Sequence, residues 1–216
     1  MFEAFEGHTT LAMPESRIGF FPDVGASYFL PRLPHRAGYW LALTAASVKG
    51  HEAVCTGLAT HYVASDRFAA LHDALPAALQ ALDGKEESTD AAHEAITQTL
   101  QTFSAPFPDD SYNATMTQRA RWFAETDLQS IHARLTEASQ NANTDATHLL
   151  SLLDSGSPYS TKITLQLFSD ASNKDLQQCL ALELALAAEA VRFPDCAEGV
   201  RSVLVDKDRN PEWQAT

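Results

Sequence analysis

The feature that most constrains this chain is a stretch in which two carboxylates each follow a proline, residues 12–33 (AMPESRIGFFPDVGASYFLPRL). Glu15 comes directly after Pro14, and Asp23 comes directly after Pro22. Because proline fixes its own backbone and disfavours helix in the residue before it, each acid is expected at a turn or at a helix entry. The segment between the acids is largely apolar. Burial there would raise the pKa of a carboxyl group, which suits general acid–base catalysis.

Structural roles compete with catalytic ones for both acids. Asp23 precedes Val-Gly-Ala-Ser and would serve equally well as the N-cap of the following helix. Glu15 would serve as an exposed loop residue. Because capping acids are commoner than catalytic ones, the spacing alone leaves both interpretations open.

The same stretch resembles a sequence motif of the crotonase superfamily. The most similar form is that of its 3-hydroxyisobutyryl-CoA hydrolase branch, which reads AMPE-x3-G-x-FPDVGG-x-YFLPRL. The chain has AMPE at 12–15, FPDVG at 21–25 and YFLPRL at 28–33. The C-terminal part resembles the same branch. Its matching segments are EGVR at 198–201, VLVDKD at 203–208, NP at 210–211 and Trp213.

The resemblance implies an α/β, crotonase-like fold of the ClpP/crotonase spiral type. In that family roughly half of the catalytic domain precedes the MPE motif, whereas here about ten residues precede it. We therefore expect a truncated form, with the last strands of the spiral plus a mainly α-helical C-terminal region. Residues 1–82 would be the C-terminal part of the catalytic core, and residues 83–216 the helical region. Such a chain would expose apolar surface and associate.

Apolar periodicity and turn signals predict short strands at 9–13 and 58–63 and a largely helical remainder. In the helix expected at 176–191, the packed face would consist of Leu176, Leu180, Leu184 and Ala187. Glu183 and Glu189 would be solvated. The other helices are expected at 25–29, 35–44, 52–55, 65–82, 96–103, 119–123, 128–138, 146–153, 158–168 and 195–205, with a polar linker at 83–92 and a solvated acidic turn at Asp109-Asp110.

Hydrolysis of a CoA thioester requires an activating carboxylate, an oxyanion hole and a channel for the pantetheine. The resemblance implies that Glu15 is the base or nucleophile at the acyl carbonyl and that Asp23 binds the 3-hydroxyl of the substrate. It places Glu15, Asp23 and Gly25 around a valine-derived 3-hydroxyisobutyryl-CoA, and the CoA of the substrate would be the only cofactor-like group. The family has a second glycine where this chain has Ala26. If that position needed a positive φ, alanine would cost about 1 kcal/mol.

The family's oxyanion hole comes from two glycine-rich segments upstream of the MPE motif, and no GGG or AGGD occurs in this chain. Three interpretations follow: a truncated hydrolase, a half that needs a separate N-terminal partner, or a non-catalytic crotonase fragment acting as an interaction subunit. Without those donors the isolated chain is expected to have negligible activity. An enoyl-CoA hydratase/isomerase-like enzyme is a further alternative, because such relatives share the glutamate. The FPD aspartate and the DKD-x-NP-x-W ending favour the hydrolase.

Charge and composition limit the kinds of partner that this chain is expected to bind. The chain has 15 basic and 28 acidic residues, a formal charge of −13 and no basic cluster, so no nucleic-acid partner is expected. Its three cysteines lack metal or redox spacing, so no metal site is expected. No apolar run approaches the ~18 residues of a membrane span, and the first residues of the sequence do not have the basic region and apolar run expected of a signal peptide, or the Arg-rich character expected of a transit peptide. We therefore expect a cytoplasmic acyl-CoA-binding protein that forms a homo-oligomer or joins a missing N-terminal half.

Overall fold

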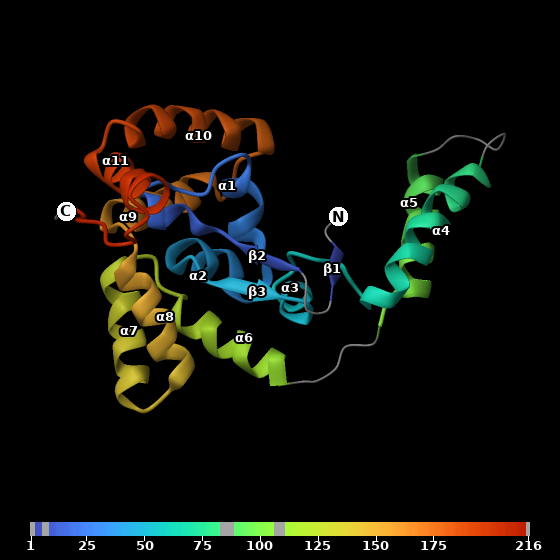
Figure 1. Cartoon of the computed structure of the whole chain (residues 1–216), viewed down its shortest axis with the longest axis horizontal. Helices are drawn as coiled ribbons and strands as arrows, with labels where there is room; N and C mark the ends of the chain where they lie inside the picture. Colours follow the sequence, from blue (N-terminus) through green and yellow to red (C-terminus); the bar gives the residue numbers. More distant parts are fainter. Residues whose placement is uncertain (1–2, 6–8, 83–88, 106–110, 215–216) are drawn as a thin grey trace. The chain divides into compact units, whose positions relative to one another are not determined.

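The computed structural model describes residues 3–5, 9–82, 89–105 and 111–214 (Figure 1). Contacts divide the chain into two compact units. The first consists of Met1–Leu11 and Val48–Tyr112, and the second of Ala12–Ser47 and Asn113–Thr216. The boundary expected at residue 82 concerns the domains of the family and stays a prediction.

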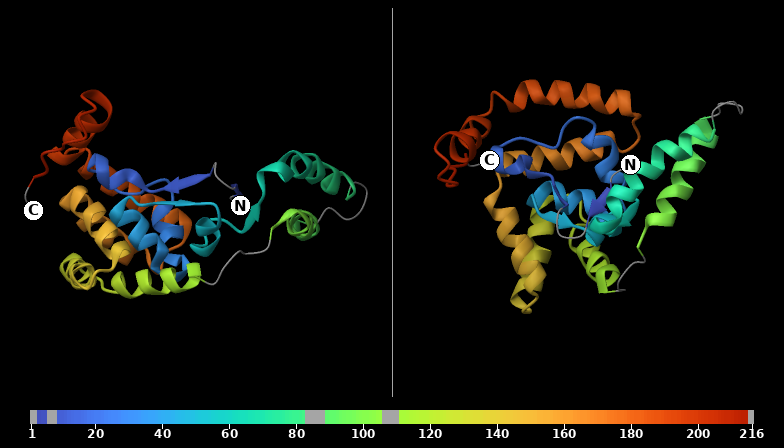
Figure 2. Two further views of the ribbon diagram at one scale, coloured as in Figure 1. Left: turned by 60° about the horizontal axis from the view of Figure 1, so that its bottom comes forward. Right: turned by 45° about the vertical axis from the view of Figure 1, so that its right-hand side comes forward.

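The first unit combines short strands with a helical hairpin. β1 runs parallel to β4, with Glu3 opposite His61. A second small sheet pairs β2 with β3. Figure 2 shows the pair formed by α4 and α5, whose apolar contacts centre on Val63, Leu71 and Leu100. The elements are β1 (Glu3–Phe5), β2 (Thr10–Ala12), β3 (Ser47–Lys49), α3 (His51–Cys55), β4 (His61–Val63), η4 (Ser65–Arg67), α4 (Phe68–Gln80) and α5 (Thr89–Phe103).

The second unit consists mainly of helices, and its described C-terminal segment, residues 207–214, has no regular secondary structure. α2 lies at its centre, with Trp40, Leu41 and Leu43 fully buried. α8 and α9 pack against α2, and α10 packs against α1 and α9. The elements are η1 (Pro14–Ile18), α1 (Ala26–Phe29), η2 (Leu30–Arg32), η3 (Pro34–Arg36), α2 (Ala37–Thr44), α6 (Ser111–Trp122), α7 (Leu128–Gln140), α8 (Thr144–Ser155), α9 (Pro158–Ala171), α10 (Leu176–Ala190), α11 (Pro194–Val200) and the π-helical turn η5 (Arg201–Val205).

Side-chain caps explain where four of these helices begin. The side chains of Asp127, Asn143, Ser157 and Asp175 accept the amide of the third helical residue in α7, α8, α9 and α10. At α10 the cap is a full capping box, because the Gln178 side chain also accepts the Asp175 amide. Such caps satisfy backbone donors that have no partner within the helix.

Most predicted helices are present, but two begin well before the expected start: α5 begins at Thr89 rather than near 96, and the short helix expected at 119–123 is the longer α6, which begins at Ser111. The strand expected at 58–63 is shorter, because only His61–Val63 pairs with β1. The linker expected at 83–92 is also shorter, because α5 begins at Thr89. Residues 83–88 and the expected turn at Asp109-Asp110 lie outside the described residues.

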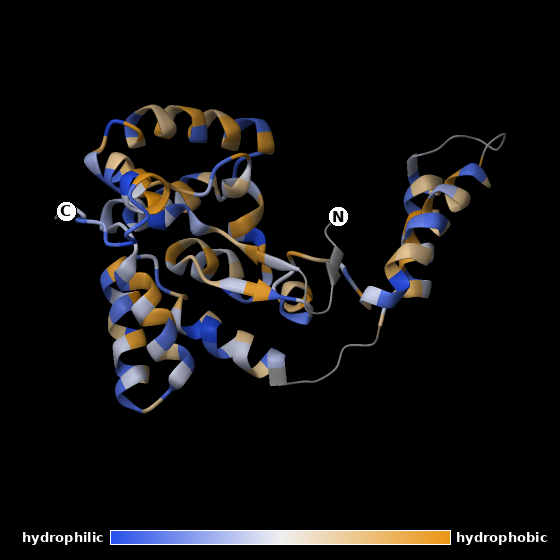
Figure 3. Ribbon diagram, viewed as in Figure 1, coloured by the Kyte–Doolittle hydropathy of each residue, from blue (hydrophilic) through white to orange (hydrophobic). Residues whose placement is uncertain are grey.

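The prediction for α10 is wrong in orientation. Leu176, Leu180 and Leu184 are 48%, 43% and 75% exposed, while Glu183 is only 4% exposed. Figure 3 shows apolar residues along α10. The face that packs on α9 contains Leu182, Leu186 and Ala190. Ala187 also packs there and is the one residue of the predicted face that is confirmed. The spacing of the leucines indicated a packed face, but contacts with α9 and α1 decide which face is buried.

Candidate functional site

Glu15 lies in a turn that is fixed by its backbone. We call residues 14–20 the Glu15 turn; it contains η1 and ends where the amide of Phe20 donates to the Glu15 carbonyl at 3.0 Å. The amide of Ser157, at the start of α9, donates to the Ser16 carbonyl at 2.9 Å. The Ser160 hydroxyl donates to the Phe20 carbonyl. The start of α9 therefore holds both ends of this turn through main-chain acceptors.

Two glycines let α11 approach the same turn closely. A Cβ atom added at Gly199 would lie 2.3 Å from the Ile18 carbonyl carbon. One added at Gly19 would lie 2.2 Å from the Asp195 carbonyl oxygen, and Gly19 also has a φ of +67°. Neither position has room for a side chain, so backbone packs directly against backbone.

The carboxylate of Asp195 completes this support from inside. Asp195 is fully buried, and it accepts the Ser157 hydroxyl at 2.5 Å and the Gln214 amide at 2.9 Å. Because a buried carboxylate is stable only when its oxygens have donors, these contacts tie α9, α11 and the C-terminal segment together.

The C-terminal motif, residues 198–213, has a structural role here. The Arg201 guanidinium pairs with Glu198 at 2.7 Å, with Asp206 at 2.7 Å and with Asp208 at 2.6 Å. Hydrogen bonds from Arg201 hold the pKa of Glu198 down at about 2. The Trp213 indole donates to the Ser155 carbonyl at 3.2 Å. The DKD-x-NP-x-W ending therefore folds back along α11 and the end of α8.

The carboxyl of Glu15 has the electrostatics expected of a reactive acid. Burial raises its pKa above the ordinary value, and the nearby charge of Asp23 raises it further, against the opposing effect of a backbone hydrogen bond. Its Oε2 atom is buried and has no hydrogen-bond partner among the described residues. An unpaired buried carboxyl oxygen is unfavourable for folding, and such groups gather at functional sites.

Asp23 lies in a second turn, residues 23–27, which we call the Asp23 turn. Its side chain is exposed. The amide of Ala26 donates to the Asp23 carbonyl at 3.0 Å, and α1 follows with no side-chain cap from Asp23. The N-cap role considered for the Asp23 side chain is therefore absent.

The structure shows a residue that the sequence analysis missed. Glu183, on α10, reaches the Asp23 turn with both carboxylate oxygens: Oε2 accepts the Gly25 amide at 2.8 Å, and Oε1 accepts the Ser27 amide at 2.9 Å and the Ser27 hydroxyl at 2.5 Å. The prediction of a solvated acid at 183 is wrong, because the three donors compensate the carboxylate for burial. Cys179, one turn before it and also buried, marked the same face in the sequence.

The backbone of the Asp23 turn has two consecutive residues in the left-handed region. Val24 has a φ of +57° and Gly25 a φ of +88°. Ala26 begins α1 and has no positive φ, so the penalty considered for alanine does not arise. The Gly25 amide is occupied by Glu183, and a Cβ there would meet Leu176 at 3.3 Å. The substrate-binding role of Gly25 stays a prediction.

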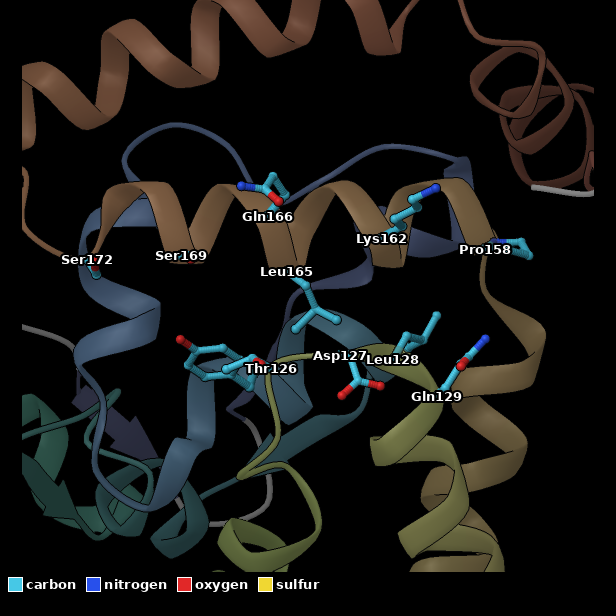
Figure 4. A pocket seen from close by; sticks show the side chains of 11 residues that line it. Thr126, Asp127, Leu128, Gln129, Pro158, Lys162, Leu165, Gln166, Ser169 and Ser172 are labelled. Atoms are coloured by element: carbon cyan, nitrogen blue, oxygen red, sulfur yellow. The ribbon is translucent and has the colours of Figure 1, made fainter.

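A cavity of about 770 Å³ lies elsewhere in the second unit, between the start of α7 and α9 (Figure 4). Neither Glu15 nor Asp23 lines it. Leu165 of α9 points toward the start of α7, where Asp127 is the N-cap, and Lys162 and Gln166 of α9 also line the cavity. We base the candidate site on the two acids, because Glu15 has a buried carboxyl oxygen with no partner among the described residues and the charge of Asp23 acts on that carboxyl. Among the described residues there is no metal-binding cluster of three His, Cys, Asp or Glu, and no helix long and apolar enough to cross a bilayer.

Comparisons with known proteins agree with the resemblance. The chain is 37% identical over 205 residues to a mitochondrial 3-hydroxyisobutyryl-CoA hydrolase of Homo sapiens, covering 94% of this chain and 50% of the relative. It is 34% identical over 219 residues to the mitochondrial enzyme of the same name from Dictyostelium discoideum, covering 98% of this chain and 53% of the relative. The chain thus spans about half the length of these curated relatives.

Solved structures show the same fold. A carnitinyl-CoA dehydratase from Mycobacterium thermoresistibile matches with a TM-score of 0.77 and 25% identity, over 98% of this chain and 55% of the other. An enoyl-CoA hydratase from Rhodobacter sphaeroides matches with a TM-score of 0.67 and 27% identity, over 95% of this chain and 54% of the other. The expected crotonase-like fold, with a mainly helical C-terminal region, is confirmed.

The comparisons also correct one expectation and settle the family. The predicted cytoplasmic location is wrong, because several of the most similar curated relatives are named as mitochondrial proteins. The family model described as enoyl-CoA hydratase/isomerase matches residues 5–216. With the two acids, the C-terminal motif and the fold all in agreement, this chain belongs to the enoyl-CoA hydratase/isomerase family.

Proposed function

We propose that this chain carries the two acids of a thioester hydrolase that converts 3-hydroxyisobutyryl-CoA to 3-hydroxyisobutyrate and CoA, a step of valine breakdown. The observation that carries this proposal is the Oε2 atom of Glu15, which is buried near the charge of Asp23 and has no hydrogen-bond partner in the described part of the chain. The identity to hydrolases of that name supports the choice of substrate. The proposed binding partner is therefore an acyl-CoA, with no cofactor other than the CoA of the substrate.

In the proposed reaction, the Glu15 carboxylate takes a proton from a water molecule as the water oxygen forms a bond to the thioester carbonyl carbon. The carbon–sulfur bond then breaks, and the CoA thiolate leaves and is protonated. A raised pKa makes Glu15 a stronger base than an ordinary carboxylate. Alternatively, the Glu15 carboxylate attacks the carbonyl carbon itself, the carbon–sulfur bond breaks and the CoA thiolate leaves, and water then cleaves the resulting anhydride.

Asp23 supplies the proposed discrimination between substrates. Its exposed carboxylate accepts a hydrogen bond from the 3-hydroxyl of the acyl group, and the positive φ values that follow it shape the turn. Gly25 contributes through this turn, beside the bound acyl group. A substrate without the hydroxyl leaves the carboxylate unpaired, so the site disfavours it.

The test measures CoA release from 3-hydroxyisobutyryl-CoA, first by the chain alone and then by the chain mixed with the half of the human relative that it does not match. We expect turnover in the mixture and little in the chain alone, because the oxyanion donors of the family lie in that other half. Glu15→Gln should lower kcat at least about 100-fold, and Glu189→Gln, an exposed glutamate on α10, is the matched control. Absence of hydrolysis in every combination would refute the proposal.

Two further outcomes have support in the comparisons and the fold. The solved relatives are named as a dehydratase and a hydratase, so water addition to an enoyl-CoA is the second candidate, visible as loss of enoyl absorbance. Binding without either reaction would favour an interaction subunit, for which the exposed leucines of α10 offer an apolar surface. Sedimentation of the chain alone and in the mixture would detect the homo-oligomer or the assembled halves.

A further inference from the structure

The Asp23 turn has a backbone that needs support from outside itself. Val24 is a β-branched residue at a φ of +57°, a conformation that is an outlier for such side chains. Its side chain is 84% exposed, so packing of its own side chain does not hold it there. A strained conformation persists only where the surrounding structure determines it.

Glu183 provides that support from α10. Its three accepted hydrogen bonds fall on Gly25 and Ser27, the residues directly after the strained position. Both partners are buried, and Ser27 is fully so. No ion pair to Glu183 occurs within the described part of the chain, so turn donors compensate its buried charge.

An apolar side chain on α10 would fill the same space without the desolvation that a buried charge incurs, but it would leave two buried amides and a buried hydroxyl of the Asp23 turn without their acceptor. The carboxylate also fixes the geometry of the turn, because its two oxygens bind two amides and a hydroxyl at the same time. We infer that Glu183 is a positioning residue, which holds the Asp23 turn so that Asp23 meets the hydroxyl of the substrate. This inference rests on the proposed function for the role of Asp23, but not for the anchoring of the turn.

The first test needs no turnover. Glu183→Gln keeps the shape but places an amide NH2 against backbone donors, so at least one hydrogen bond to a charged acceptor is lost. We expect amide hydrogen exchange at Gly25 and Ser27 to accelerate about tenfold or more, as loss of such a bond implies. Glu189→Gln, the same change at an exposed position of the same helix, should leave both amides unchanged. Equal exchange in the two variants would overturn the inference.

The second test separates positioning from folding. The readout is the ratio of kcat/KM for 3-hydroxyisobutyryl-CoA over isobutyryl-CoA, measured in the assembled protein. Glu183→Gln should reduce this ratio about tenfold, and Ser27→Ala, which removes one donor from the other side, should reduce it in the same direction. In the background of Asp23→Asn, Glu183→Gln should have little further effect, because both act through the same carboxylate.

The outcomes distinguish the inference from the proposed function. An unchanged ratio in Glu183→Gln, with accelerated exchange, would mean that Glu183 anchors the turn without positioning Asp23, and would overturn the inference while the hydrolase proposal stands. If the wild-type protein hydrolyses neither ester, the hydrolase proposal fails, and the exchange measurement still decides whether Glu183 holds the turn.

Discussion

The two acids of the candidate site are eight residues apart in sequence, yet their turns are supported in different ways. The Glu15 turn is held by main-chain contacts with α9 and α11, and two glycines leave no space for a side chain between the backbones. The Asp23 turn is held by the side chain of Glu183 and contains a strained valine. A turn fixed by backbone packing tolerates little variation. A turn fixed by one side chain can be altered by one substitution, which suits the substrate selection that we propose for Asp23.

The largest effect is expected where the Glu15 turn meets α11. Gly199→Ala would place a methyl group 2.3 Å from the backbone of Ile18, although alanine is normally the better helix former. We expect a loss of about 3 kcal/mol in the free energy of unfolding, measured by urea denaturation. Gly156→Ala is the control, because there the nearest atom would be the Ser16 hydroxyl at 3.3 Å. If the two variants are equally stable, the close backbone approach does not support the Glu15 turn.

The next effect concerns the polar support of the same turn. Ser157→Ala removes the N-cap of α9 and one of the donors to buried Asp195. A lost cap and a poorly paired buried carboxylate together should cost about 2–3 kcal/mol, measured by the same denaturation. Ser155→Ala, at an exposed position two residues earlier, should change the free energy of unfolding by less than about 0.5 kcal/mol. A Ser157 variant as stable as the Ser155 variant would contradict this role.

Substitution of Glu15 itself is expected to change stability less than the two preceding variants, and to raise it rather than lower it. Because its pKa in the folded protein is raised, the ionised form is unfavourable in the fold at neutral pH. Glu15→Gln should therefore raise Tm at pH 7 by about 1–3 °C. As pH falls through the raised pKa the wild-type carboxyl becomes protonated. The difference should disappear below the ordinary glutamate value of 4.5. A Glu15 variant that is less stable at pH 7 would show that the carboxylate has a stabilising partner.

The comparison of the two turns also shows which features of the site can be predicted from the sequence. The prolines correctly predicted that Glu15 and Asp23 lie at turns, and Ser157-Pro158 predicted the start of α9. The burial of Glu183 was not predictable from local patterns, because its partners are more than 150 residues away along the chain.

The leucine spacing of α10 indicated the wrong buried face. The side that packs carries Leu182 and Leu186 together with alanines, a cysteine and Glu183, and the regular spacing of the exposed leucines hides this pattern. The close approach at Gly199 likewise depends on two segments that only the fold brings together. Local chemistry thus predicts each acid and its turn, whereas the supports are tertiary.

The smallest effect on stability is expected at Asp23. Its carboxylate is exposed and accepts no cap bond from α1, so Asp23→Asn should change Tm by no more than about 1 °C. It should nevertheless lower the preference for the hydroxylated ester about tenfold. Removing its charge also removes one cause of the raised pKa of Glu15, so the acidic limb of the kcat/KM profile should move to lower pH.

Asp66→Asn, at another exposed aspartate, is the control for charge loss alone. An Asp23 variant that unfolds as readily as Ser157→Ala would place Asp23 among the supports of the fold, and the contrast between the two turns would be wrong.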